Sequence, residues 1–198
     1  MNVGMIRLGL AIVAALFLVH VPAANAAQIA KEPDPAAYCL QKGGVVQTRL
    51  PAYNTNGDNP LILAGQRQFC QFTSKKDGSQ INVLVSTLAT RKPSLAALAY
   101  YAEVQMGSCQ GNPASCYCTQ LGGSDLFGGA TGAGGGWVLS TDTNDVLEAC
   151  IFPDMSSIDS WGLAYHSNGI IRGKDLAKAL RYKNPYDAVR EAAKYLPY

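Results

Sequence analysis

Histidine is almost missing from this chain of 198 residues, which contains only His20 and His166. His20 lies in a predicted export signal, so His166 would be the only imidazole left after the signal is removed. A zinc site needs four ligands, mostly histidines or closely spaced cysteine pairs, and acid–base catalysis at neutral pH relies most often on histidine. We therefore expect no metal and no cofactor, and a role without catalysis.

An excess of charge of either sign is also missing. Lysine and arginine together number 16, against 14 aspartates and glutamates, for a formal net charge of +2. Proteins that bind nucleic acid or anionic lipid surfaces usually carry a concentrated basic patch. The near-neutral balance gives no electrostatic reason to expect such partners, and we predict no nucleic-acid partner.

Two motifs of catalysis are missing as well. The glycine-rich run at 128–136 does not end in Gly-Lys-Ser/Thr, and it leads through Trp137 into a predicted strand. This pattern indicates a surface loop and not a phosphate-binding loop. No G-x-S-x-G turn indicates a serine hydrolase. His166 with Asp154 or Asp159 is the remaining hydrolytic candidate, but these two acids are more simply explained as helix caps.

Long apolar runs are missing after the first 26 residues. Arg7 precedes an apolar run at 8–19, Pro22 interrupts it, and Ala-Asn-Ala at 24–26 supplies small side chains for cleavage. The run is shorter than the roughly 20 residues that a membrane-spanning helix needs. The pattern predicts a cleavable signal peptide at 1–26 and no lipid anchor. We expect a periplasmic or secreted protein without stable membrane insertion.

Cysteine is present in an even number, and all six cysteines follow the predicted signal: Cys39, Cys70, Cys109, Cys116, Cys118 and Cys150. In an oxidising compartment this count predicts three disulfides, for which fifteen pairings exist. The first two cysteines are separated by nearly the same number of residues as the last two. This similarity favours Cys39–Cys70 and Cys118–Cys150, and it leaves Cys109 to pair with Cys116. A metal or redox site at the closely spaced middle cysteines is the alternative.

The same order of residue types occurs twice. Asp34 and Asn112 each precede a proline, a Tyr-Cys pair and a Gly-Gly pair, and a Cys-x-Phe and a Leu-Ala-Tyr follow later in each case. Aspartate or asparagine caps a helix, proline fits its first position, and glycine ends it. The pattern predicts an α+β fold of two tandem αββα-like modules, each crosslinked internally by disulfides, with a C-terminal helical extension. The predicted divisions are a signal at 1–26, a degenerate module at 27–107, a second module at 108–172 and a tail at 173–198.

Further elements follow from apolar periodicity and turn residues. The predicted strands cover 45–50, 66–72, 81–88, 137–140 and 146–152, with a turn at 142–145. The predicted later helices cover 94–106, 157–166, 174–182 and 185–196. Two long connections, 54–65 and 124–136, are predicted loops. Loops on a rigid scaffold commonly carry recognition.

The second module also carries a family resemblance. It reads Asn-Pro-Ala-Ser from Asn112, then Tyr-Cys, Gly-Gly, Cys-Ile-Phe-Pro-Asp from Cys150, and finally Trp161. This order resembles a small cysteine-containing bacterial domain of unknown function that is often labelled a hemolysin. Family members typically have two more cysteines around the tryptophan helix, and the first module lacks the Phe-Pro-Asp and the tryptophan. The resemblance implies an exported domain and transfers no catalytic residue.

Together these features predict an exported binding or inhibitory module of the bacterial cell envelope, with an unknown envelope protein or glycan as its partner. A secreted hydrolase that uses His166 is the alternative, and a membrane-active, hemolysin-like protein is the third possibility. The candidate binding residues are the two tryptophans and two neighbours in the second module: Trp137, Trp161, Tyr165 and His166.

Overall fold

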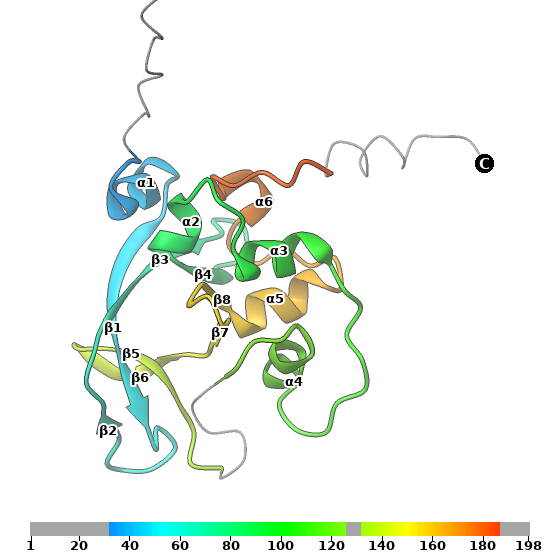
Figure 1. The fold of residues 1–198 in the computed structure, drawn as a ribbon. Coiled ribbons are helices and arrows are strands. Elements are labelled where there is room, and N and C mark those ends of the chain that lie inside the picture. Colours follow the sequence, from blue (N-terminus) through cyan, green and yellow to red (C-terminus); the bar gives the residue numbers. More distant parts are fainter. Residues whose placement is uncertain (1–31, 126–131, 187–198) are drawn as a thin grey trace, which may run out of the picture. The chain divides into compact units, whose positions relative to one another are not determined.

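The computed structural model describes residues 32–125 and 132–186, which form a mixed α+β fold, as predicted (Figure 1). An antiparallel sheet of eight strands has the order β6-β5-β1-β3-β4-β8-β7, and β2 pairs with β1. The strands are β1 (Val45–Tyr53), β2 (Leu61–Ile62), β3 (Arg67–Thr73), β4 (Gln80–Leu84), β5 (Gly135–Leu139), β6 (Asp142–Leu147), β7 (Ala149–Ile151) and β8 (Ser157–Asp159). The helices are α1 (Pro35–Gln41), α2 (Val85–Ala89), α3 (Leu95–Ala102), α4 (Pro113–Gln120), α5 (Ser160–His166) and α6 (Leu176–Ala179).

Strand β1 connects two parts of the sheet. Its first half, from Val45 to Arg49, pairs with β3, and its second half, from Arg49 to Tyr53, pairs with β5. Figure 1 shows the β5–β6 hairpin crossing this second half of β1, away from α1. The hairpin therefore extends the sheet beyond the second half of β1.

The sheet buries apolar side chains on both faces, because neighbouring residues of a strand point to opposite sides. On β3, Cys70 belongs to the main core with the helices, whereas Phe69 belongs to a smaller core. The smaller core lies under the hairpin and contains Trp137, whose ring centroid is 5.7 Å from that of Phe69. The hairpin is thus held by its own apolar contacts.

Helices α1 and α4 begin and end in the same way, as their sequences predict. Asp34 accepts a hydrogen bond from the N–H of Ala37, and Asn112 accepts from the N–H groups of Ala114 and Ser115. A proline occupies the first turn of each helix. The glycines that follow them, Gly43 and Gly122, have φ angles of 81° and 82°, a left-handed conformation that glycine adopts without steric cost.

Three disulfides join the cysteines in the pairs that their spacing favours. Cys39 of α1 is bonded to Cys70 of β3, and Cys118 of α4 is bonded to Cys150 of β7, with sequence separations of 31 and 32. All four of these cysteines are fully buried. Cys109 and Cys116 form the third, local disulfide. Each buried disulfide fixes a short helix on the sheet. These helices have eight or fewer residues, and a helix of that length is not stable by itself.

Several predicted elements differ in the structure. The strand predicted at 81–88 ends at Leu84, and 85–89 forms α2 instead, where Leu88 and Ala89 face the core. The turn predicted at 142–145 is wrong, because these residues begin β6. The helix predicted at 157–166 starts later, since 157–159 form β8. The last two errors share a cause, because pairing with distant strands overrides local apolar pattern and turn propensity at β6 and β8.

The tail differs from its prediction as well. The helix predicted at 174–182 is reduced to the single turn of α6, which buries Leu176 and Leu180 in the main core. Tyr38 of α1 donates a hydrogen bond to the carbonyl of Ala179 at 3.2 Å. The helix predicted at 185–196 lies almost wholly outside the described residues.

The second glycine of each Gly-Gly pair lies directly against a disulfide. A Cβ atom on Gly44 would lie 2.3 Å from the Sγ of Cys70, and one on Gly123 would lie 2.4 Å from the Sγ of Cys150. Gly44→Ala or Gly123→Ala should therefore lower the free energy of unfolding by about 1–3 kcal/mol through overpacking, as measured by urea denaturation of the oxidised protein. Gly107→Ala is the matched control, because its nearest neighbour is the flexible side chain of Gln120 at 3.4 Å. Equal stability of all three variants would contradict this account of the packing.

Candidate functional site

A polar cavity of about 450 Å³ lies between the β5–β6 hairpin, the edge of β4 and the first turns of α4 and α5. Its wall contains four acids, two arginines and several amides and hydroxyls. The residues that line it are Arg49, Thr55, Asn56, Gln80, Asn82, Asn112, Ser115, Asp125, Gly134, Gly135, Asp145, Val146, Leu147, Glu148, Asp159, Trp161 and Arg172. Polar side chains in such number distinguish this cavity from an ordinary packing defect, which is apolar.

The two loops that the sequence predicts as recognition segments meet at this cavity. The N–H groups of Asn54 and Asn56 donate to the carbonyls of Gly134 and Ala133, both at 3.0 Å. The side chain of Asn56 donates to the carbonyl of Gly132 at 3.1 Å. Residues 126–131 of the second loop lie outside the described residues. The described parts of both loops are therefore bonded to each other and share one wall of the cavity.

The cap of helix α4 also positions an acid of the cavity. Asn112 accepts backbone hydrogen bonds through Oδ1, while its Nδ2 donates to both carboxylate oxygens of Glu148, at 3.1 and 3.2 Å. Aspartate would cap the helix equally well, but it has no donor and would repel Glu148. Asparagine can thus begin this helix and hold the glutamate at the same time.

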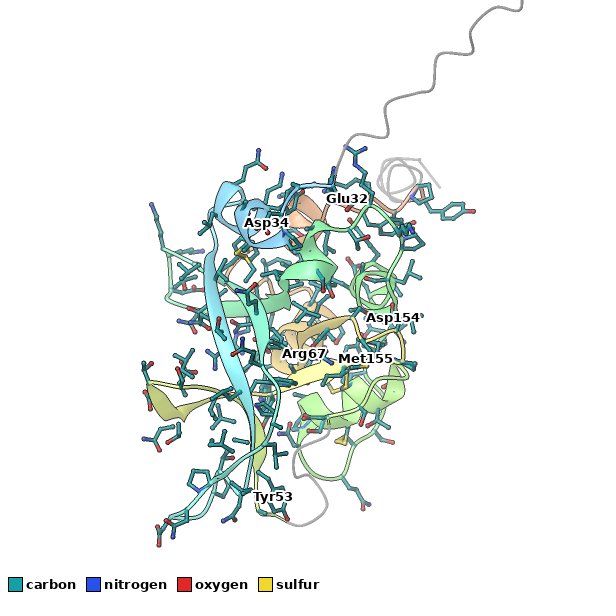
Figure 2. All side chains as sticks on the ribbon, turned by 60° about the vertical axis from the view of Figure 1, so that its left-hand side comes forward. Glu32, Asp34, Tyr53, Arg67, Asp154 and Met155 are labelled. Atoms are coloured by element: carbon teal, nitrogen blue, oxygen red, sulfur yellow. A yellow bond between two sulfur atoms is a disulfide. The ribbon has the colours of Figure 1, made fainter. Side chains whose placement is uncertain are left out.

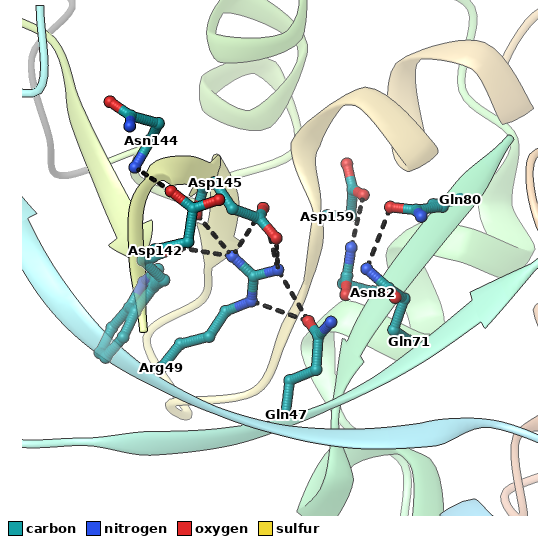
Figure 3. Close-up of polar contacts among 10 residues, drawn as sticks. Gln47, Arg49, Gln71, Gln80, Asn82, Asp142, Asn144, Asp145 and Asp159 are labelled. Atoms are coloured by element: carbon teal, nitrogen blue, oxygen red, sulfur yellow. Dashed lines mark hydrogen bonds and ion pairs between the residues drawn. The ribbon is translucent and has the colours of Figure 1, made fainter. Parts of the chain in front are cut away.

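The cap of helix α5 likewise faces the cavity. Asp159 is 6% exposed, accepts from the N–H of Gly162 at 2.9 Å, and receives the Nδ2 of Asn82 at 3.4 Å (Figure 3). The prediction that Asp159 caps a helix is confirmed. Asn82 is 4% exposed, and its Oδ1 accepts no hydrogen bond from the residues that the structure describes.

Arg49 forms the opposite wall and is 1% exposed. Its guanidinium donates to the carbonyls of Trp137 and Asp145, to the carboxylate of Asp145, and to Oε1 of Gln47 at 2.7 Å (Figure 3). The planar guanidinium suits such a set of fixed acceptors. This network ties the hairpin to β1 and neutralises Asp145, so these two charges cancel within the wall.

The pKa values of the remaining acids of the cavity, Asp125, Glu148 and Asp159, are raised above their ordinary values. Burial raises the pKa of Glu148, although hydrogen bonds from Asn112 and Trp161 offset part of this effect, and the neighbouring charges of Asp125 and Asp159 raise it further. Burial also raises the pKa of Asp125, against a 2.7 Å hydrogen bond from Ser115. Three carboxylates with raised pKa values in one cavity are typical of a functional site.

The sequence-predicted aromatic residues are divided between the cavity and other places. Trp161 is half-buried and lines the cavity. Tyr165 lies one helical turn further, with its ring centroid 6.0 Å from that of Trp161, and the guanidinium of Arg172 lies 5.1 Å from its ring. Trp137 is 5% exposed and belongs to the small core, so it does not line the cavity.

His166 lies at the other end of α5 from Asp159. Its ring stacks on that of Tyr100 with centroids 3.8 Å apart, and its Nε2 is 3.4 Å from a carboxylate oxygen of Glu103. Asp154 is bonded elsewhere, to the N–H of Leu95 at 2.8 Å and to Ser156. The structure therefore does not bring His166 together with Asp154 or Asp159 in one site.

Two other hollows are less polar. One, of about 610 Å³, lies beside β3 and the β7–β8 turn, where Arg67 donates to the carbonyl of Met155 at 3.2 Å (Figure 2). Another, of about 500 Å³, lies between α3 and α4 and has a mostly apolar wall. Over the described ranges, no three acids, histidines or cysteines are close enough to hold a metal ion. No helix of those ranges is long and apolar enough to cross a membrane.

Neither protein-family models, nor curated proteins, nor solved structures contain a match to this chain. The resemblance of the second module to the hemolysin-labelled domain therefore stays a prediction. The sequence pointed to Trp161 and Asp159 and to the two loops that contribute to the wall, but the remaining residues of the cavity, Arg49 and Glu148 among them, were missed. They occur singly, on elements far apart in the chain, and no short motif contains them.

The raised pKa of Glu148 has a direct consequence for stability. The folded protein binds the proton of Glu148 more tightly than the unfolded chain does, so this residue stabilises the fold least when it is ionised. Its contribution is lost as the pH rises from the ordinary value of 4.5 through the raised pKa. Glu148→Gln should therefore raise the free energy of unfolding at pH 7 and flatten its decline above pH 4.5.

The measurement is urea denaturation of the wild type and the variant across this pH range. Asp58→Asn is the control, because it removes an equal charge from an exposed loop residue outside the cavity. A difference between wild type and Glu148→Gln that does not change with pH would contradict the prediction.

Proposed function

We propose that this protein is an exported binding module of the bacterial cell envelope that holds a small polar ligand, a glycan fragment, in the polar cavity. The observation that carries the proposal is the meeting of two loops, 54–65 and the described part of 124–136, at one cavity with partly buried carboxylates. The three disulfides fit a protein of an oxidising compartment.

The size and chemistry of the cavity favour a glycan over a protein partner. A volume of about 450 Å³ falls within the range of small-molecule sites, whereas a stable protein interface buries about 800 Å² on each partner. Amides, carboxylates, hydroxyls and an arginine provide both donors and acceptors, which suit the hydroxyl groups of a sugar. Trp161 adds an aromatic side chain to the same wall.

We also propose that the chain consists of two copies of one α-β-β-β-α unit. The first support is the strand that follows each Gly-Gly pair. In the first unit Val45 pairs with Gln71, one residue after the strand cysteine. In the second unit Ser124 forms an isolated bridge with Ile151, again one residue after the strand cysteine.

The second support is the next strand and its helix. Cys70 pairs with Val83 and Cys150 pairs with Ile158, and in both units a helix follows shortly after this strand. Val83 and Ile158 also pair with each other where β4 meets β8. A two-fold axis between two copies places equivalent residues opposite each other in an antiparallel contact, as Val83 and Ile158 are here.

This correspondence corrects the match of the closing helices. Sequence order pairs the Leu-Ala-Tyr of 98–100 with that of 163–165, but 98–100 belong to α3. The helix that follows β4, as α5 follows β8, is α2, and its buried Leu88-Ala89 corresponds to the buried Leu163-Ala164. A crystal structure in which superposed units did not bring Val83 onto Ile158 would contradict the duplication.

The duplication explains where the cavity lies. In the first unit the chain after Gly44 continues directly into the long strand β1. In the second unit Ser124 forms an isolated bridge with the sheet, and the next described strands are those of the β5–β6 hairpin. The cavity occupies the side of the second unit where this strand is missing. We infer that divergence of the second copy created the binding site.

The two alternative functions have less support. A hydrolase that uses His166 would place its base against Tyr100, outside the cavity. A membrane-active protein would use exposed apolar side chains, and Leu61, Ile62 and Leu63 on and after β2 offer a short row of them. Turnover of a bound glycan would favour the first alternative, and leakage of dye from liposomes would favour the second.

The proposed function is tested by blocking the cavity. Thr55 is half-buried on the 54–65 loop and lines the cavity, so Thr55→Trp should fill part of it without disturbing the core. We expect the immobilised wild type to retain soluble glycan fragments released from bacterial envelopes, and Thr55→Trp to retain at least about tenfold less, a difference of about 1.4 kcal/mol. Retained fragments are identified by mass spectrometry.

Asn59→Trp is the matched control, because Asn59 is an exposed residue of the same loop that does not line the cavity. This variant should retain the same fragments as the wild type. Equal retention by Thr55→Trp, or retention of a protein and no glycan, would contradict the proposal.

A further inference from the structure

The charges that face the polar cavity are unequal. Arg49 and Asp145 pair with each other at 3.1 Å and leave no net charge. Three other carboxylates line the cavity, those of Asp125, Glu148 and Asp159, against the single guanidinium of Arg172. The charge of Arg172 acts on Asp159. The wall therefore retains an excess of negative charge beside Glu148 and Asp125.

Among the described residues, Glu148 receives side-chain hydrogen bonds from neutral groups only. Asn112 donates to both of its oxygens, and the indole of Trp161 is a further donor. No lysine, arginine or histidine forms a salt bridge with Glu148 within 32–125 and 132–186. A half-buried carboxylate without a cationic partner is unfavourable. A positively charged group on the ligand would provide that partner.

Asn82 independently indicates a ligand that donates hydrogen bonds. Its Nδ2 is bonded to Asp159, whereas its Oδ1 has no donor among the described residues, although the side chain lies in the cavity wall and is 4% exposed. A buried acceptor without a donor is unfavourable, because it has lost its hydrogen bonds to water. Both Asn82 and Glu148 thus need a ligand that donates hydrogen bonds, which disfavours phosphate, sulfate and carboxylate groups.

A divalent metal ion is not favoured as the cation that pairs with Glu148. The acids of the cavity do not form a group of three that could hold a metal ion, as far as the described residues extend. An ammonium group differs from a metal ion, because it binds through three separate hydrogen bonds and does not need a closed shell of oxygens. Glu148, Asp125 and the Oδ1 of Asn82 supply hydrogen-bond acceptors in the wall of this cavity.

We propose that the cavity binds its ligand through a primary ammonium group, which Glu148 holds as the counter-ion and to which Asp125 and Asn82 offer further acceptors, and that an unacetylated amino sugar is the class of glycan that supplies it. This inference rests on the proposed function and names the ligand of the same site. Acetylation of the amine removes its charge and two of its donors, so an N-acetylated sugar should lose most of the binding.

The test is a nuclear magnetic resonance titration of the ¹⁵N-labelled, oxidised protein at pH 7 with D-glucosamine, N-acetyl-D-glucosamine, D-glucose and cadaverine. We expect a dissociation constant for glucosamine at least about tenfold lower than for the two neutral sugars. Cadaverine carries ammonium groups without a sugar, so it tests whether the sugar contributes to binding. We expect it to bind more weakly than glucosamine. Glu148→Gln should abolish the preference for glucosamine, whereas Asp58→Asn should preserve it.

The outcomes separate this inference from the proposed function. Equal affinity for glucosamine and its N-acetylated form, with both lost in Thr55→Trp, would overturn the ammonium inference and support the cavity as a glycan site. Glucosamine binding that survives Thr55→Trp, or that Glu148→Gln does not weaken, would place the ammonium elsewhere and overturn the inference. Failure of all four probes would also overturn it, while the proposed function would still be tested by the retention of envelope fragments. Tighter binding of cadaverine than of glucosamine would reject the amino sugar as the source of the ammonium.

Discussion

The disulfide between a short helix and the sheet is the contact on which the rest of this structure depends. It occurs twice, at Cys39–Cys70 and Cys118–Cys150, and each time a glycine without a side chain makes room for the sulfur atoms. Closing a loop of about thirty residues stabilises a fold by about 3–4 kcal/mol in the chain-entropy model. Because helices of seven and eight residues have little stability of their own, these crosslinks allow the connecting segments to vary without loss of the frame.

In the duplication proposed above, the two units use that freedom differently. The first fills the space after its helix with β1, the longest strand, which supports both β3 and the hairpin. Within the described residues the second has no equivalent long strand, and it contributes the β5–β6 hairpin, which Arg49 fastens to β1. The space left beside α4 and α5 is lined by carboxylates and amides. Burial of these polar groups, and ionisation of the carboxylates, lower the free energy of unfolding. The crosslinked frame supplies stability elsewhere in the fold that offsets this cost.

Local chemistry predicted much of the frame but little of the cavity. The caps Asp34, Asn112 and Asp159, the glycine stops and the disulfide pairs follow from residue types at short spacing, and the structure has them. The change from strand to helix at Leu84 was missed, because apolar residues at 81–88 fit both periods equally well. The second role of Asn112, as the holder of Glu148, depends on a contact 36 residues away that no local pattern reports. The loops were predicted as recognition segments, but their meeting at one cavity follows only from the pairing of β1 with β5.

The two tryptophans allow the most direct test of the central claim, that the polar cavity is the binding site. Trp161 lines the cavity, whereas Trp137 lies in the small core, so their indole N–H resonances report on a bound ligand and on the frame separately. Addition of soluble envelope glycan fragments to the ¹⁵N-labelled protein should shift the Trp161 indole resonance and leave that of Trp137 in place. A shift of neither resonance, or of Trp137 alone, would contradict the assignment of function to this cavity.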